Sequence, residues 1–404
     1  MSKLIIDGAN IVLPDEVLEE GYLRIEDGII AAVGTGKASP ERGFSYIDAS
    51  GLYLLPGLID IHSDAIEKEV QPRPNVAIPV PSSCRELERK LAAVGITTIF
   101  HSLSFSGGEG IRSNALAAEC ARFIGRYADQ GHLIRNFVHL RYEIGNTKAL
   151  GLIYELLEEG ACDLLSFMDH TPGQGQYRDI SQYHHYIKKT FFLEDKDCQR
   201  MIEEKLQARQ RVNFKALKDL AQWAKEANIP LASHDDDSPE RIEVASAMGV
   251  DVIEFPMNLE TAKYAKNLGL HVCVGAPNLL QGRSHNGNLS AQVAVEEGAA
   301  DILCSDYYPP ALLKGIFKLA DNGMDISRAV NLASLNPAIA LGLDDEIGSL
   351  EVGKKADFIL VRLEENDPLV ITTATEGKIV LSYNYHDPSH LEGVLAPEKE
   401  AIAQ

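Results

Sequence analysis

The stretch that decides the fold is LPGLIDIHSD, residues 55–64, where a short apolar run leads into a histidine and an aspartate. Alternate side chains of a β-strand face the same side, so His62 and Asp64 can reach one point. A short apolar run that ends in polar residues is typical of a buried strand in a parallel sheet. Residues 55–64 therefore predict a strand with two polar groups at its carboxyl end.

Further runs of the same design follow along the chain. They are TTIFHSLSF, FVHLRYEI, DLLSFMDH, PLASHDDD, VDVIEFPM, HVCVGAPN and ADILCSDY, which makes eight with GLIDIHSD. Helical patterns separate them, as in FKALKDLAQWAKEA, where Phe214, Leu217, Leu220 and Ala224 share one face after the capping residue Asn213. Eight strands that alternate with helices predict an α/β fold, a (β/α)8 barrel of the TIM type.

The two ends of the chain have a different pattern from the middle. Residues 3–55 show short strands with tight turns, including the hairpin signal Asp27-Gly28, and GSLEVGKKADFILVR and GKIVLSYN return to this pattern near the end. We expect 1–55 and 345–404 to share one small sheet module and 56–344 to form the barrel. Residues 171–212 are too long for an ordinary βα loop and are predicted to be a lid-like, substrate-gripping insertion.

Composition excludes several classes of protein. The 404 residues are 45% hydrophobic and 24% charged, which is ordinary for a soluble globular chain. Lysine and arginine number 38 against 59 acidic residues, and the net charge of −21 argues against nucleic acid and anionic membranes as partners. The six scattered cysteines form no CxxC pair, and MSKLIIDGANIVLPDE lacks a signal-peptide core. We expect a cytoplasmic protein with reduced thiols.

The carboxyl ends of the predicted strands carry the chemistry, because barrel sites form there. Imidazole and carboxylate groups that end five different strands are the ligands that zinc, iron(II) and manganese prefer, and a carboxylate can bridge two ions. His101 lies inside a strand and stays outside this set. The predicted ligands are His62, Asp64, Glu143 (on the third run), His170, His234 and Asp306.

Two motifs resemble a known superfamily. LLPGLID followed by the HxD pair is similar to the first barrel strand of the amidohydrolase superfamily, whose usual form is HxH. EIGSLEVGKKADFILV resembles the return of that superfamily into its small β-sandwich. The resemblance covers nearly the whole chain and implies a barrel joined to a composite β-sandwich of the N- and C-terminal segments.

A closer resemblance is to the PhnM family of phosphonate-metabolism proteins within that superfamily. It rests on HSDAIEKEVQPRP, HLRYE, MDHTPGQGQY, SHDDDS, EFPMNLETA, GAPNLLQGRSHNGNLSA and DILCSDYYPPALL, in this order. Members hydrolyse the triphosphate of 5-triphosphoribose 1-methylphosphonate to the 5-phosphate and diphosphate. Ala65 and Glu69 depart from the family pattern, which tends to carry Asn and His there, next to the metal ligands.

The resemblance also implies roles for the site residues. Two divalent ions are expected, zinc first, with iron or manganese as alternatives. Glu143 takes the place of the bridging ligand, and Asp306 contacts a metal and accepts the proton of the attacking water.

A polyphosphate must be held against a net charge of −21, so the site needs cations of its own. Arginine is the better phosphate ligand, because its guanidinium pairs with two oxygens at once. The glycine-rich stretch 275–288 permits close approach of the backbone to an anion. The candidates are Arg73, Arg141, Arg178, Arg283 and His285, with Lys188 and Lys189 as further cations.

Two other functions stay open at this point. The first is hydrolysis of a C–N bond in a cyclic amide, an N-acyl amino acid or a base, on the same binuclear metal site. The second is a scaffold without activity, which the complete set of ligand residues disfavours. A small phosphorylated sugar is the expected partner, and a homodimer is common for such barrels.

Overall fold

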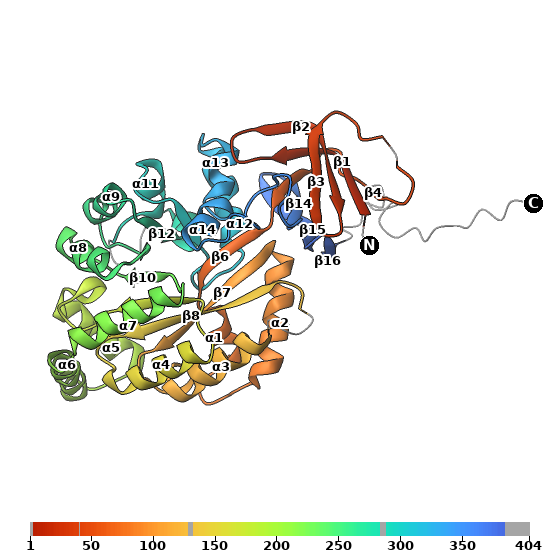
Figure 1. The fold of residues 1–404 in the computed structure, drawn as a ribbon. Helices are drawn as coiled ribbons and strands as arrows, with labels where there is room; N and C mark the ends of the chain where they lie inside the picture. The colour runs from red at the N-terminus through yellow and green to blue at the C-terminus, as the bar shows by residue number, and fades with distance from the viewer. Residues whose placement is uncertain (1–2, 40, 128–131, 283–287, 384–404) are drawn as a thin grey trace, which may run out of the picture.

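The computed structural model describes residues 3–39, 41–127, 132–282 and 288–383 and contains two sheets (Figure 1). One is an eight-stranded parallel sheet in sequence order, which confirms the predicted (β/α)8 barrel. Its strands are β6 (Leu58–Ser63), β7 (Ile96–Phe105), β8 (Arg135–Glu143), β9 (Leu164–Met168), β10 (Leu231–His234), β11 (Val252–Glu254), β12 (His271–Gly275) and β13 (Ile302–Cys304). An isolated parallel bridge between Ser63 and Asp306 brings the first and last strands together.

The barrel strands form from runs that are buried on both faces. Every residue of β6 and β7 is buried, because side chains of one face fill the barrel and those of the other pack under the helices. The helices that follow the strands are α1 (Ala65–Val70), α2 (Val80–Ala93), α3 (Asn114–Tyr127), α4 (Leu150–Glu158), α7 (Phe214–Glu226), α8 (Pro239–Met248), α9 (Leu259–Asn267), α10 (Ala276–Gln281), α11 (Ala291–Glu296), α12 (Ala311–Asp321), α13 (Ile326–Asn331) and α14 (Leu335–Ala340).

Helix α7 has the N-terminal cap and most of the buried face that its sequence predicts. The Asn213 side chain caps it by accepting hydrogen bonds from the backbone N–H groups of Lys215 and Ala216. Leu217, Leu220 and Ala224 are buried as predicted. Phe214 is not part of the buried face: its side chain is 51% exposed, and the Arg209 guanidinium lies 5.5 Å from its ring centroid. In the first turn the ring stacks against the preceding helix instead of the barrel.

The second sheet joins the two ends of the chain, as expected. It consists of β1 (Lys3–Val12), β2 (Val17–Glu26), β3 (Ile29–Thr35), β4 (Ser45–Asp48), β5 (Tyr53–Pro56), β14 (Phe358–Glu364), β15 (Asp367–Thr375) and β16 (Lys378–Ser382). The antiparallel pairing of β5 with β14 makes the connection. Asp27 and Gly28 both have positive φ, at 51° and 84°, which suits the predicted hairpin turn.

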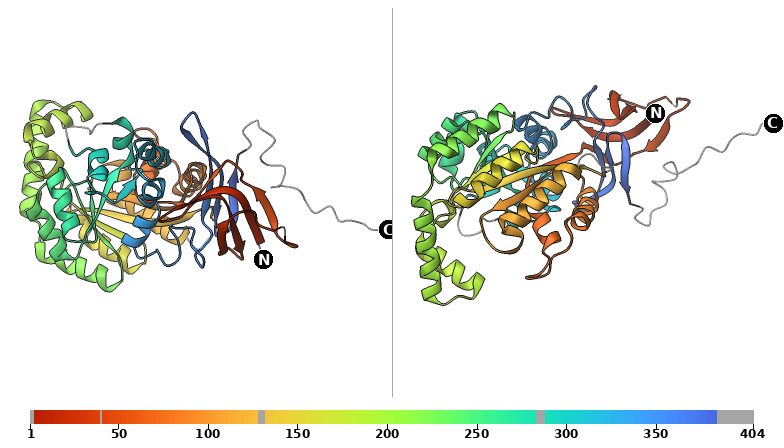
Figure 2. Two further views of the ribbon diagram at one scale, coloured as in Figure 1. Left: turned by 90° about the horizontal axis from the view of Figure 1, so that it is seen from above. Right: turned by 60° about the horizontal axis from the view of Figure 1, so that its bottom comes forward.

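The insertion 171–212 contains the short helix η3 (Gly175–Tyr177) and the longer α5 (Ile180–Phe191) and α6 (Asp195–Gln210). Both views of Figure 2 place these helices at the end of the molecule opposite the second sheet. A small apolar cluster of its own holds the pair together, made of Tyr183, Ile187, Cys198 and Ile202. The insertion is therefore a packed helical pair and not an irregular loop.

Two further expectations concern the whole chain. All six cysteines lie in the described segments, are buried and carry free thiols. Among the described helices none is both long and apolar enough to cross a bilayer.

Candidate metal centre

The six predicted ligands lie at the carboxyl ends of their strands, where the polar ends of a parallel barrel converge. His62 is in β6 and Asp64 directly precedes α1, Glu143 ends β8, and His234 ends β10. His170 follows β9 and Asp306 follows β13, each by two residues. Glu143 thus ends the third barrel strand, which agrees with the count made from the sequence.

Asp64 and Asp306 are brought together by backbone hydrogen bonds between the first and last strands. The Asp306 N–H donates to the His62 carbonyl at 3.0 Å, and the Asp64 N–H donates to the Asp306 carbonyl at 2.6 Å. Asp306 has a φ of 55°, in the left-handed region that aspartate tolerates better than most residues. Burial raises the pKa of Asp306, His62 lowers it and Asp64 raises it, and the result lies above the usual aspartate range.

The three predicted histidines lie side by side. The ring centroid of His234 is 5.4 Å from that of His62 and 5.5 Å from that of His170. Phe255 packs against the rings of His62 and His234, with centroid distances of 4.9 and 5.2 Å. The Phe255 ring therefore restricts the positions of both imidazoles on one side.

Glu143 and Asp235 flank His170. The Nδ1 atom of His170 is 2.9 Å from Glu143 Oε2, and its Nε2 atom is 3.2 Å from Asp235 Oδ2. Burial lowers the pKa of His170, but the hydrogen bonds to Asp235 and Glu143 outweigh it and raise the pKa to about 9. The site therefore favours a positive charge at this position.

Arg141 lies inside this cluster. Its Nη1 donates to Asp64 Oδ1 at 2.6 Å, and its Nη2 is 3.3 Å from His234 Nε2. A guanidinium is only a donor, so His234 Nε2 accepts. Burial lowers the pKa of Arg141, yet the carboxylates of Asp64 and Glu67 outweigh it and raise the pKa above the usual range. The predicted substrate ligand is thus a buried cation that balances Asp64.

The two other predicted arginines that the structure describes, Arg73 and Arg178, differ from Arg141 in being exposed. Arg73 is exposed after α1, and Arg178 is exposed directly after Tyr177, whose ring centroid is 6.0 Å from that of His170. Arg283 and His285 lie outside the described residues. His101, left outside the set, bonds Asn136 through Nε2 at 2.9 Å within the barrel wall.

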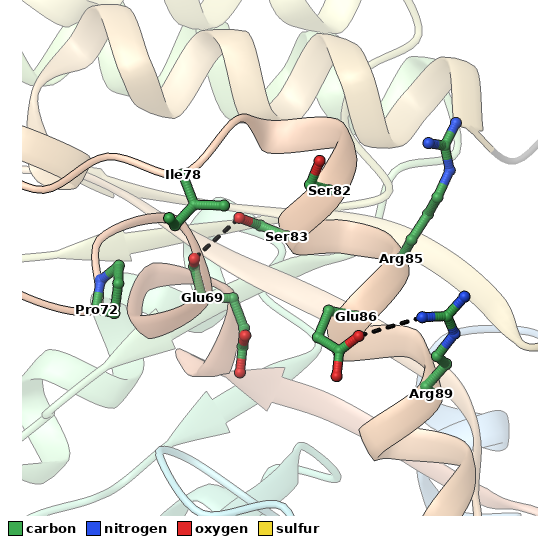
Figure 3. A pocket seen from close by; sticks show the side chains of 8 residues that line it. All are labelled: Glu69, Pro72, Ile78, Ser82, Ser83, Arg85, Glu86 and Arg89. Atoms are coloured by element: carbon green, nitrogen blue, oxygen red, sulfur yellow. Dashed lines mark hydrogen bonds and ion pairs between the residues drawn. The ribbon is translucent and has the colours of Figure 1, made fainter.

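The two departures from the family pattern occupy different surroundings. Ala65 is buried as the first residue of α1, directly after Asp64. Glu69 pairs instead with Lys90 at 2.6 Å, and its backbone carbonyl accepts a hydrogen bond from Ser83. Figure 3 shows Glu69 in a surface groove between α1 and α2 whose lining contains none of the predicted ligands. The expectation that Glu69 lies beside the ligands is therefore not met.

Four polar residues of the cluster were not singled out from the sequence. Arg112, the last residue of the short helix η1 (Gly110–Arg112) after β7, lies 3.6 Å from Asp64 Oδ2 and 2.9 Å from Glu67 Oε2. Asp235 follows His234, and Glu254 ends β11. His139 precedes Arg141 and Glu143 at two-residue intervals on β8, so all three face the barrel interior. That alternation was the signal available for His139.

The donors present fit divalent cations. His170, His234 and Asp235 each offer a ligand atom, and these atoms lie within 4.8 Å of one another. His62, His139 and Glu254 form a second such group, and all three of these residues are buried. Mixed imidazole nitrogen and carboxylate oxygen suit zinc, iron(II) or manganese. Of the six predicted ligands, His62, His170 and His234 belong to these two groups.

A parallel barrel with histidines and carboxylates at its strand ends defines a metal-dependent hydrolase of the amidohydrolase class. The Amidohydrolase family pattern matches residues 181–381, and the chain belongs to this family. It is 33% identical over 390 residues to the alpha-D-ribose 1-methylphosphonate 5-triphosphate diphosphatase of Escherichia coli (strain K12), covering 93% of this chain and 100% of that protein.

Other similar proteins share the fold with different activities. A dihydroorotase of Geobacter sp. (strain M21) is 24% identical over 405 residues and covers 89% of each chain. The crystal structure of a Xaa-Pro dipeptidase with bound methionine superposes with a TM-score of 0.65 at 16% identity, covering 95% of this chain and 100% of that chain. At this identity the dipeptidase supports the fold alone.

Proposed function

We propose that this enzyme hydrolyses the triphosphate of α-D-ribose 1-methylphosphonate 5-triphosphate and releases diphosphate, leaving the 5-phosphate. The observation that carries the proposal is the 33% identity to the Escherichia coli diphosphatase over the whole length of that protein. The substrate is then a small phosphorylated sugar. A cytoplasmic location and a homodimer stay predictions.

Two divalent ions, zinc first and iron or manganese otherwise, would be held by His62, Asp64, Glu143, His170, His234 and Asp306. His170 contacts Glu143, and the His234 ring lies beside the rings of His62 and His170. Backbone hydrogen bonds join Asp306 to His62 and Asp64. Bound there, the ions would lower the pKa of a water molecule to near neutrality and hold charge on the phosphate oxygens.

Asp306 is the proposed proton acceptor. A base works best when its pKa approaches the working pH, and the pKa of Asp306 is raised by its buried position. Its backbone contacts with His62 and Asp64 hold it at the seam of the barrel, beside two of the proposed ligands.

Basic side chains at the mouth would hold the phosphates. Arg178, next to Tyr177, and Arg73 are exposed and available to a ligand. Arg112 joins them, because 52% of its side chain is exposed while Glu67 and Asp64 hold it in place. The insertion 171–212 would fold over the substrate, and Arg209 of α6 anchors it by donating to Asp169, the neighbour of His170, at 2.7 Å.

Hydrolysis of a C–N bond in a cyclic amide is the second candidate. The similarity to a dihydroorotase over 89% of both chains favours it. Such a substrate needs the same ions but no cluster of arginines.

A panel of substrates separates the two. We expect a higher kcat/KM for the ribosyl triphosphate than for nucleoside triphosphates, and no turnover of dihydroorotate or other cyclic amides. Turnover of a cyclic amide with inert phosphoanhydrides would transfer the assignment to the second candidate.

A further inference from the structure

Glu254 is a fully buried carboxylate below the proposed ligands. It ends β11, with 0% of its surface exposed, and its side chain points into the barrel. Its Oε1 is 2.7 Å from His62 Nδ1, and its Oε2 accepts a hydrogen bond from the Ser166 hydroxyl at 2.7 Å. Both carboxylate oxygens are thus in use, and the carboxylate is fixed between β6 and β9.

The hydrogen bond decides which nitrogen of His62 can bind an ion. A carboxylate accepts, so His62 Nδ1 must carry the proton that it donates. The lone pair then lies on Nε2, which faces Asp64, with Oδ1 at 4.0 Å. The nitrogen that a ligand histidine offers is set by the hydrogen bond of the other nitrogen.

His139 supports the same ring from another side. Its ring meets that of His62 edge to face, with centroids 5.2 Å apart and planes at 81°. Its Nδ1 is 3.0 Å from the Ser102 hydroxyl, and its Nε2 is 3.7 Å from Glu254 Oε2. The His62 ring is therefore held by a hydrogen bond below and by rings on its flanks.

We propose that Glu254 is the positioning residue of the metal centre: it locks His62 in the Nδ1–H form and turns Nε2 towards the ions. This inference rests on the proposed metal centre and adds a residue to it. The same three donors could instead hold a cation of their own. The 2.7 Å between His62 Nδ1 and Glu254 Oε1 disfavours that, since two ligand atoms about 2.0–2.2 Å from one zinc at tetrahedral angles lie farther apart.

The test compares zinc affinities of metal-free wild-type protein and variants by competition with a chromophoric chelator. Glu254→Gln keeps the shape but removes the charge, and we expect zinc to bind about 10- to 100-fold more weakly. Ser166→Ala removes the hydrogen bond to one oxygen of Glu254, so its zinc affinity should fall by a smaller factor. This variant provides the test if Glu254→Gln fails to fold.

Glu88→Gln is the matched control. Glu88 is 3% exposed and accepts hydrogen bonds from the backbone of Leu133 and from Tyr127, away from the proposed ligands. We expect its zinc affinity to equal that of the wild type. Nitrogen NMR of zinc-loaded protein should show the His62 proton on Nδ1 in the wild type and a changed His62 signal in Glu254→Gln.

Three results would overturn the proposal. Unchanged zinc affinity in Glu254→Gln and Ser166→Ala is one, and an equal loss in Glu88→Gln is another. If Glu254→Gln binds one zinc ion fewer per chain and binds the other zinc ion with unchanged affinity, Glu254 is itself a metal ligand. If the wild type binds no zinc, iron or manganese, the proposed metal centre fails before this inference is reached.

Discussion

Asp306 sits where the first and last barrel strands meet, and its left-handed backbone limits what can replace it. Asparagine tolerates this conformation and keeps the side-chain shape, but it accepts no proton at neutral pH. We expect Asp306→Asn to keep most of the bound metal and to lose on the order of 10²–10⁴ in turnover. The measurements are kcat and metal content on one preparation. Near-normal turnover with full metal would assign the base to another residue.

Arg178 is the exposed cation that directly follows the aromatic neighbour of His170. A charge-assisted hydrogen bond contributes about 1.5–3 kcal/mol, so Arg178→Ala should weaken a triphosphate substrate about 10- to 150-fold with metal content unchanged. Lys188→Ala is the control, because Lys188 is exposed on the same insertion and paired with Asp195. Equal effects of both variants would indicate bulk charge instead of a specific contact.

Much of the site could be predicted because strand ends are visible in the sequence. His62 and Asp64 share a strand face, and His170 and His234 follow apolar runs. Glu254 ends a strand in the same way, yet its side chain turns into the barrel and bonds His62. Arg141, predicted to bind the substrate, is buried and pairs with Asp64, which the sequence did not indicate. Such pairings join residues far apart in the chain, so no local pattern contains them.

At the scale of elements, Asp163 connects two barrel strands. Its Oδ2 accepts a hydrogen bond from the backbone N–H of Val138 in β8 at 2.7 Å, directly before β9 begins. Burial raises the pKa of Asp163 from 3.8 to about 6, although the Val138 bond lowers it in part. The folded state therefore holds this proton more tightly than the unfolded chain does.

The contribution of Asp163 to the free energy of unfolding is fully present below about pH 4, and it is lost as the pH rises through about 6. The loss amounts to at most about 3 kcal/mol, from 1.36 kcal/mol per pKa unit. Asp163→Asn keeps an oxygen for Val138 without the charge. We expect its thermal midpoint relative to wild type to be higher at pH 7.5 than at pH 4.5. A difference that is the same at both values would contradict the raised pKa.

The helical pair α5–α6 has an apolar cluster separate from that of the barrel. Ile187 is 1% exposed in that cluster, and an Ile→Ala change in such a position costs about 2–5 kcal/mol. We expect Ile187→Ala to speed amide hydrogen exchange in 180–210 and to leave β6–β9 protected. Ile153→Ala, in the barrel cluster, should lower the thermal midpoint of the whole protein. Faster exchange throughout the barrel in Ile187→Ala would show that the pair is not independent.

The elements themselves were largely predictable, since all eight barrel strands are short apolar runs with polar ends. Phe214 shows the limit of such reasoning. Its helical periodicity puts it on the apolar face, but at the first turn the neighbouring Arg209 offers its ring a partner outside the barrel. Helical periodicity alone does not show at which residue a helix stops packing against the barrel.

At the scale of the whole molecule, the second sheet meets the barrel away from the site. Arg135, the first residue of β8, pairs with Asp357 and with Glu376 of the C-terminal segment, and the Gly57 N–H donates to the Asp357 carbonyl. These contacts lie at the amino ends of β6 and β8, the end of a barrel that serves stability. The carboxyl ends and the insertion are left free for a ligand.

The function proposed for this barrel is the cleavage of a phosphoanhydride with release of diphosphate. The most direct measurement is phosphorus NMR of α-D-ribose 1-methylphosphonate 5-triphosphate incubated with zinc-loaded enzyme. We predict that the triphosphate signals are replaced by those of diphosphate and a 5-phosphate monoester, with the methylphosphonate signal retained, and that Asp306→Asn slows this conversion. An unchanged spectrum, or release of single phosphate ions instead of diphosphate, would contradict the account.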